Sequence, residues 1–199
     1  MRSDRQRLRR ESFTIICNNC IGGVIYSDFQ KQFQSPTINL FFYAPDYIKF
    51  LENLNYYLGQ KLCFVSESKY TTERLGYPIG KLDDIEIHFQ HYASEEDAYD
   101  CWCRRITRID FDNLYIIGSD RDYSTEEIRH RFSKLPYQNK LYFVSRPAKY
   151  KHEIYFDLYK GQQFIGELIS DKKAWYYYFD FSEWINNGVI KQYYFRKKL

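Results

Sequence analysis

The first group of residues that could do chemistry is Asn18-Asn19-Cys20, which directly follows the apolar run 13–16. That run has the length and β-branched content of a buried strand, and apolar residues return at helical spacing after it. In open α/β sheets ligands bind at the carboxyl ends of strands, and a helix starting near Cys20, with Gly22 in its first turn, would offer its N–H groups to an anionic ligand. The alternative is structural: an asparagine caps the helix, and Gly22 permits close helix–sheet packing.

Candidate acid–base groups cluster between residues 83 and 91, where Asp84, Glu86, His88 and His91 follow one another closely. Apolar and polar residues alternate along this segment, which predicts a strand with one buried face and with Glu86 and His88 on the other face. Each of the four side chains is a candidate base for a hydroxyl group. The carboxylates could instead bind Mg²⁺ on a substrate phosphate, and the structural alternative is a solvated edge strand that follows a polar turn.

Candidates for binding a phosphate or carboxylate lie in two further places. Arg104 and Arg105 stand near the end of a predicted helix, and Asp120 and Arg121 follow the apolar run 114–117. Arginine pairs with such anions through two parallel hydrogen bonds. The first two could equally be surface charges of the helix, whereas the charged pair after an apolar strand stands where ligands usually bind.

The five cysteines are expected to be reduced, because the sequence lacks the pattern of a secretory signal. Cys17-x-x-Cys20 before a helix is also typical of thioredoxin-like proteins, but Cys17 should belong to the strand. A zinc site from Cys17, Cys20, Cys101 and Cys103 is chemically conceivable, although positions i and i+2 of a helix face different directions. Cys20 at a helix N-terminus could be a nucleophile, with a buried inert thiol as the alternative.

The elements expected to position these groups are strands and helices that alternate along the chain. Strands are predicted at residues 13–16, 62–65, 85–89, 114–117 and 140–145, and helices from about residue 20 and at 44–58, 95–107 and 124–134. Ser94 with Asp97, and Ser124 with Glu127, have the spacing of capping boxes. The pattern predicts an α/β fold with a three-layer α/β/α, Rossmann-like arrangement around a mostly parallel or mixed central sheet.

At 199 residues the chain is expected to form a single α/β domain, 1–199. Residues 1–11 are a basic N-terminal segment, and 150–199 are an aromatic-rich region, in which strand and helix cannot be separated at 175–184. The polar segment 66–75 is predicted to be a loop, in a position that suits a lid or an insertion.

Composition excludes several classes of protein. A net charge of +3 is too small to indicate nucleic-acid binding. The sequence also contains no stretch of about 18 apolar residues, which is the length needed to span a membrane. We therefore expect a cytoplasmic protein, whose basic ends (1–11 and 196–198) are either solvated or associate peripherally with the anionic inner face of the membrane. The aromatic content of 20% suits sugar stacking or interfaces, or simply reflects genome composition.

Several motifs together resemble a bacterial family of unknown function whose members are often labelled exopolysaccharide or capsule biosynthesis proteins. The motifs, in order, are FTIIxNNCxGG (13–23), SPT to DYIKFLENL (35–54), YPxGKLxDIEIHFxHY (77–92), WxRR (102–105) and DRD (120–122). The resemblance covers residues 13–147 and implies a three-layer α/β/α fold.

What the resemblance implies for function is a cytoplasmic step in building a surface polysaccharide, by transfer of a sugar, acyl or phospho group. The partners would be an activated sugar or acyl donor, which is anionic, and a saccharide acceptor. Asn18, Asn19, the helix N-terminus and an arginine among Arg104, Arg105 and Arg121 would then face the donor's phosphate, and one of the four candidate bases would deprotonate the acceptor. Neither the residues nor the resemblance identifies a cofactor.

Two other functions stay open on the residues alone. The first is a non-enzymatic module that binds a saccharide or an assembly partner through aromatic side chains and basic ends. The second is a small hydrolase that uses a metal ion or Cys20.

Overall fold

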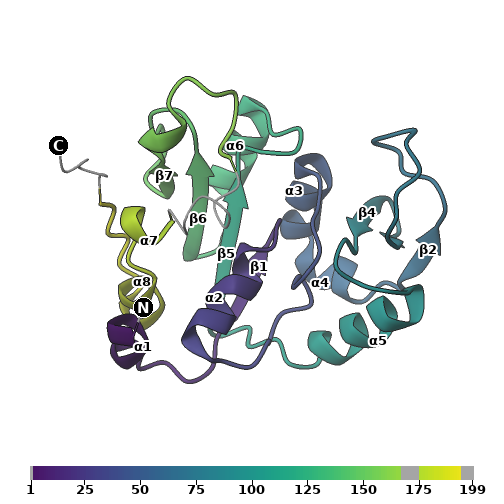
Figure 1. Cartoon of the computed structure of the whole chain (residues 1–199), viewed down its shortest axis with the longest axis horizontal. Coiled ribbons are helices and arrows are strands. Elements are labelled where there is room, and N and C mark those ends of the chain that lie inside the picture. The colour runs from purple at the N-terminus through teal and green to yellow at the C-terminus, as the bar shows by residue number, and fades with distance from the viewer. Residues whose placement is uncertain (1, 167–174, 194–199) are drawn as a thin grey trace.

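The computed structural model describes residues 2–166 and 175–193, which form an α/β fold with two separate sheets (Figure 1). The larger sheet is parallel, in the order β1-β5-β6-β7, and the smaller sheet is antiparallel, in the order β2-β3-β4. The parallel strands are β1 (Thr14–Cys17), β5 (Leu114–Ser119), β6 (Asn139–Val144) and β7 (Glu153–Tyr155). The antiparallel strands are β2 (Cys63–Val65), β3 (Ile79–Leu82) and β4 (Ile85–His88).

The strands predicted at 62–65 and 85–89 do not join the parallel sheet, so the expectation of one central sheet was wrong for them. Only Asp83 and Asp84 separate β3 from β4, and a connection this short can join only antiparallel neighbours. Asp83 has the left-handed φ of 53° that tight hairpin turns favour. The chain therefore folds back on itself as a hairpin, and β2 pairs with the outer edge of β3.

A short segment at Phe41 and Phe42 joins the two sheets. The backbone of Phe41 exchanges two hydrogen bonds of 2.9 Å with the backbone of His88, at the end of β4. The N–H of Phe42 donates to the carbonyl of Asn18, just after β1, at 3.1 Å. The carboxyl ends of β1 and β4 therefore face a common space.

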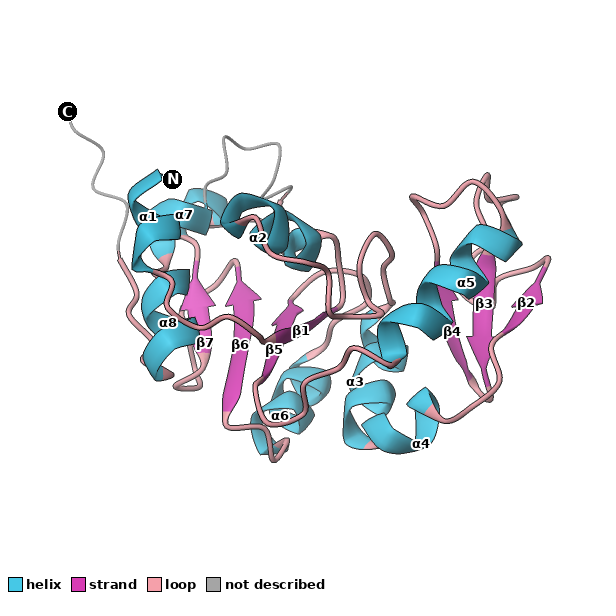
Figure 2. Ribbon diagram, turned by 90° about the horizontal axis from the view of Figure 1, so that it is seen from below, coloured by secondary structure: helices cyan, strands magenta, loops and turns pink. Residues whose placement is uncertain are grey.

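Helices cover both faces of the parallel sheet (Figure 2). On one face α2 (Ile21–Phe29) packs in a core with Ile15, and on the other α3 (Ala44–Glu52) and α6 (Glu126–Lys134) pack in a core with Ile16. Successive strand residues point to opposite faces, which places these two isoleucines in different cores.

The predicted helix boundaries are right in part. α5 (Glu95–Ile106) begins as expected, because Ser94 Oγ accepts a hydrogen bond from the N–H of Asp97 at 3.1 Å. α6 is capped by Thr125 and not by Ser124, whose hydroxyl lies 2.6 Å from that of Tyr142 instead. The single helix expected at 44–58 is divided at Asn53 into α3 and α4 (Leu54–Leu58).

The aromatic-rich region contains helical turns: the 3-10 helix η1 (Asp157–Tyr159) and the helices α7 (Trp175–Tyr178) and α8 (Phe181–Asn187). The basic N-terminal segment forms α1 (Arg2–Arg7) and packs against α8.

Two contacts join these ends. Arg7 forms an ion pair of 2.5 Å with Asp180, and Arg10 Nε donates to the carbonyl of Ile185 at 2.9 Å. At least part of the positive charge expected to be solvated is thus paired within the chain. Residues 196–198 lie outside the described residues. No helix in the described ranges has both the length and the apolar character needed to cross a bilayer.

Candidate functional site

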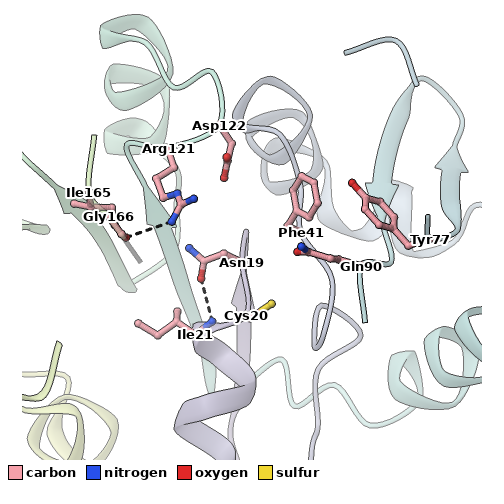
Figure 3. Close-up of a pocket in the computed structure, with 10 residues that line it drawn as sticks. All are labelled: Asn19, Cys20, Ile21, Phe41, Tyr77, Gln90, Arg121, Asp122, Ile165 and Gly166. Atoms are coloured by element: carbon pink, nitrogen blue, oxygen red, sulfur yellow. Dashed lines mark hydrogen bonds between the residues drawn. The ribbon is translucent and has the colours of Figure 1, made fainter. Parts of the chain in front are cut away.

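A cavity of about 270 Å³ opens at the carboxyl edge of the parallel sheet, between the ends of β1 and β5 and the antiparallel sheet (Figure 3). We call it the site cavity. Its lining consists of Asn19, Cys20, Ile21, Phe41, Tyr77, Gln90, Arg121, Asp122, Ile165 and Gly166. Three of the polar segments considered in the sequence, at 18–20, 83–91 and 120–121, each supply at least one of these residues.

The two asparagines after β1 differ in role. Asn18 is buried and its amide donates to Ser119 Oγ at 3.2 Å, which ties the end of β1 to the end of β5. Asn19 lines the site cavity, and its Oδ1 accepts from the N–H of Ile21 at 3.0 Å. The first N–H group of α2 therefore already has a partner, although the N-cap residue of α2 is Cys20 and not an asparagine.

Gly22 serves close packing between α2 and β1. A Cβ atom on Gly22 would lie 3.3 Å from Cβ of Cys17, which is tighter than most side-chain contacts. Cys17 belongs to β1 as expected, and burial raises the pKa of its thiol to about 12, so it stays protonated. All five cysteines are free thiols. Of the two cysteines in the Cys17-x-x-Cys20 motif, only Cys20 lines the site cavity.

Arg121 contributes a positive charge to one wall of the site cavity. Its Nη1 donates to the carbonyl of Gly166 at 3.3 Å, which orients the guanidinium across the ends of the strands. Asn19 lies below it in Figure 3, and its amide nitrogen donates long hydrogen bonds of 3.5 Å to Asn18 Oδ1 and to Ser119 Oγ.

Asp120 holds the wall of the cavity together. Its carboxylate accepts from the N–H and the hydroxyl of Ser145, at 2.8 and 2.9 Å, and from the N–H of Ile165 at 2.8 Å. With the side chain buried and both oxygens occupied, Asp120 links β6 to the segment that carries Gly166. This contact set is typical of a structural carboxylate, whereas the sequence predicted a ligand-binding one.

Glu86 and His88 are buried, so the structural alternative of a solvated edge strand was wrong. The cause is the loop that follows β2, which covers this face. Ser68 Oγ and the N–H of Lys69 donate to the Glu86 carboxylate at 2.8 and 2.7 Å. The Lys69 ammonium in turn pairs with the buried carboxylate of Asp46 at 2.8 Å.

His88 connects this buried group to the site cavity. Its Nε2 lies 3.4 Å from a Glu86 oxygen without reaching hydrogen-bond geometry, and its Nδ1 lies 3.4 Å from the hydroxyl of Tyr77. The ring stacks on Phe41, with centroids 4.7 Å apart. Burial lowers the pKa of the His88 imidazole, against the opposing effect of Glu86, so the ring is neutral near pH 7.

The remaining predicted residues lie elsewhere. Asp84 is exposed at the hairpin turn, where Lys49 and Tyr57 hydrogen-bond it and lower the pKa of its carboxyl. At about 3.3 Å per strand residue, the four residues of β4 put Asp84 roughly 13 Å from His88. His91 is also exposed and does not line the cavity.

The two arginines of α5 do not line the site cavity either. Arg105 is buried and donates to the carbonyl of Ile38 and the hydroxyl of Tyr92, at 3.3 and 2.6 Å. Arg104 is exposed, as a surface charge would be. The structure therefore brings Asn19, Cys20 and Arg121 together, without these arginines.

Phe41, Tyr77, Gln90 and Asp122 line the cavity and were not predicted as site residues. Tyr77 and Asp122 stand in two of the motifs quoted above, which was the available signal. Phe41 gave none, because it reaches the site only through its bridge to His88.

No three His, Cys, Asp or Glu side chains within residues 2–166 and 175–193 gather so as to hold a metal ion. Of the four cysteines considered for zinc, Cys101 and Cys103 belong to α5, whereas Cys17 ends β1.

The chain is similar in sequence to a known protein family and to a bacterial relative. A family described as "Domain of unknown function (DUF1919)" matches residues 1–186. The chain belongs to the DUF1919 family. An uncharacterized protein of Haemophilus influenzae is 36% identical to it over 192 residues, which cover 94% of this chain and 90% of the relative. The resemblance to an uncharacterised domain family is thereby confirmed.

Proposed function

We propose that this DUF1919 chain is a transferase of exopolysaccharide or capsular polysaccharide biosynthesis, and that the site cavity binds the anionic activated donor next to an acceptor hydroxyl. The observation that carries the proposal is that a cationic side chain and a hydroxyl group stand on opposite walls of the site cavity. Arg121 stands on one wall, and Tyr77 stands on the other with its hydroxyl directed into the cavity (Figure 3).

The two walls suit the two halves of a transfer reaction. Arg121 and the Asn19 amide would bind the donor's phosphate or similar leaving group and take up the charge that develops on it. The acceptor oxygen would form its bond to the transferred group as the bond from that group to the leaving group breaks.

The acceptor's proton has a route within the protein. With the His88 proton on Nε2, facing Glu86, Nδ1 is free to accept the Tyr77 proton as Tyr77 receives that of the acceptor. Glu86 would then stabilise the imidazolium that forms. Of the four candidate bases, this proposal retains Glu86 and His88, acting through Tyr77, and no longer uses Asp84 or His91.

The proposal includes a cytoplasmic location and a three-layer Rossmann-like arrangement, which the helices on both faces of the parallel sheet support. Peripheral membrane association would rest on basic residues other than Arg7 and Arg10, which are paired within the chain.

A second candidate function is a non-enzymatic module that binds a saccharide. Exposed aromatic rings beside the site cavity favour it: Tyr123 and Phe164 expose 60% and 44% of their surfaces. Such a module would bind the saccharide but would leave an activated donor intact.

The proposal is tested by thermal-shift titration with nucleotide sugars and acyl-CoA. A donor at 100 times its Kd stabilises the folded protein by about 2.7 kcal/mol. We expect one donor class to raise Tm, and Arg121→Gln to weaken that donor about tenfold, with Arg104→Gln, a surface arginine, as the matched control. No shift from any donor, or an equal loss in both variants, would contradict a donor site at Arg121.

A further inference from the structure

A second cavity of about 700 Å³ adjoins the site cavity at the same edge of the parallel sheet. We call it the outer cavity, and it is lined by Tyr43, Asp120, Asp122, Tyr123, Ser124, Arg146, Gln162, Gln163 and Phe164. The two cavities share Asp122, so they lie next to each other.

The two cavities differ in volume, and this difference suits two different ligands. Sites for small molecules usually enclose about 300–1,000 Å³. At about 270 Å³ the site cavity is too small for a donor and an acceptor together, whereas the outer cavity has room for several sugar rings.

Two aromatic rings in the outer cavity are displayed to solvent. Tyr123 exposes 60% of its surface and Phe164 exposes 44%. The Tyr123 ring is fixed from behind by Tyr43 and Tyr70, with centroids 5.2 and 5.9 Å away. A rigid, open aromatic face of this kind suits stacking against the apolar face of a sugar ring.

The backbone under Tyr123 is strained. Asp122 and Tyr123 have consecutive left-handed φ values of 56° and 66°, in a region that non-glycine residues rarely adopt. The N–H of Ala44 donates to the carbonyl of Asp122 at 2.8 Å and holds this conformation in place. The strained backbone leaves the Tyr123 ring exposed, so burial of the ring does not account for the strain. Backbone strain of this kind is found preferentially at ligand sites.

The outer cavity is lined by one positive charge, that of Arg146, by the carboxylates of Asp120 and Asp122, and by neutral polar groups. Arg146, exposed at the end of β6, forms no ion pair with any residue that the structure describes. Gln162 and Gln163 are exposed and present amide groups, which can both donate to and accept from sugar hydroxyls. The Asp120 carboxylate is occupied by Ser145 and Ile165, as described above.

We propose that the outer cavity is the acceptor subsite and that it binds a saccharide chain bearing a negatively charged substituent. A sugar ring stacks on Tyr123, and the carboxylate or phosphate of the chain pairs with Arg146. The proposal rests on the proposed function only in placing the reacting end of this chain in the site cavity.

The test is a calorimetric titration of the full chain, without a donor, against three tetrasaccharide probes: tetragalacturonate, a phosphorylated maltotetraose and neutral maltotetraose. We expect a charged probe to bind more tightly than the neutral one, and the two charged probes distinguish a carboxylate from a phosphate. Tyr123→Ala should weaken the charged probe about tenfold, and Arg146→Gln about fivefold without affecting the neutral probe. Tyr99→Ala and Arg104→Gln, exposed residues of α5, are the matched controls.

Binding that Tyr123→Ala and Arg146→Gln weaken, and the controls do not, supports the subsite. The proposal is overturned if no charged probe binds, if the neutral probe binds equally well, or if the controls lose as much affinity. Folding of each variant is checked by its thermal transition. The donor titration is a separate readout: a failed acceptor subsite leaves the Arg121-dependent shift intact, and a failed donor site leaves the Tyr123-dependent binding intact.

Discussion

The hydroxyl oxygen of Tyr77 lies 3.4 Å from Nδ1 of His88, and it joins the site cavity to a carboxylate that the cavity does not reach. Burial raises the pKa of Tyr77 to about 12, so the phenol remains protonated at neutral pH. It can therefore relay a proton only because His88 is positioned to accept one.

If this relay operates, Tyr77→Phe should lower kcat of the transfer reaction about 100-fold, while donor affinity changes less than twofold. The phenyl ring keeps the packing and removes only the hydroxyl. Tyr56→Phe, which removes the hydroxyl paired with Asp83 at the hairpin turn, is the control. Steady-state kinetics with the donor found by thermal shift give the answer, and an unchanged kcat would remove Tyr77 from the mechanism.

Asp120→Asn should destabilise the fold by about 2–3 kcal/mol, because an NH₂ group would replace an oxygen that now accepts from a backbone N–H. Both oxygens have such donors, from Ser145 and Ile165, so neither orientation of the amide satisfies all of them. Urea unfolding measures the difference, with Asp112→Asn as the exposed control. A variant that unfolds like the wild type but loses activity would show that Asp120 acts on a ligand after all.

Tyr123→Gly should be more stable than Tyr123→Ala by about 1 kcal/mol, because φ is 66° and only glycine adopts this region without cost. Both variants lack the ring, so their difference isolates the backbone strain. At Tyr99, inside α5, the order should reverse, with alanine more stable by about 1 kcal/mol. Chemical denaturation of the four variants tests this, and alanine matching glycine at position 123 would mean that the backbone there is not strained.

Stability should fall as the pH drops from about 7 toward 4, in part because of His152. Burial first, and then the charge of Lys140, lower the pKa of His152 to about 4, whereas an unfolded histidine titrates near 6.5. Between these values the unfolded state binds the extra proton, so acid favours unfolding.

The test replaces the His152 ring by a neutral one of similar size. His152→Phe should reduce the loss of unfolding free energy between pH 8 and pH 5 by on the order of 2 kcal/mol. His91→Gln, which changes an exposed ring, is the control and should keep the wild-type slope. Equal slopes for the wild type and His152→Phe would mean that His152 does not titrate in this range.

The sequence predicts three of the four parallel strands, β1, β5 and β6, because each contains a short, continuous apolar run, whereas β7 lies beyond residue 149, where no strand was predicted. β1 and β5 are buried on both faces, and such strands need no long-range information to be recognised. β3 was missed, since Gly80 and Lys81 interrupt its apolar pattern and only its pairing with β4 defines it.

The sequence predicted only those residues of the site that directly follow a parallel strand. Asn19, Cys20 and Arg121 follow parallel strands and meet because such strands end at one edge of the sheet. Asp84 and His88 are close in sequence but stand at opposite ends of β4, so proximity along the chain was misleading there. The bridge between Phe41 and His88, which brings Tyr77 to the cavity, depends on tertiary folding that no local pattern reports.

The ion pair between Arg7 and Asp180 joins residues 173 positions apart. On the ribosome, Arg7 is therefore made long before its partner, and β1 likewise precedes β5 by about 100 residues. The docking of α1 onto α8 cannot occur until almost all of the described chain has been synthesised. Until Asp180 has been synthesised, Arg7 therefore lacks the ion pair that it forms with this residue in the folded protein.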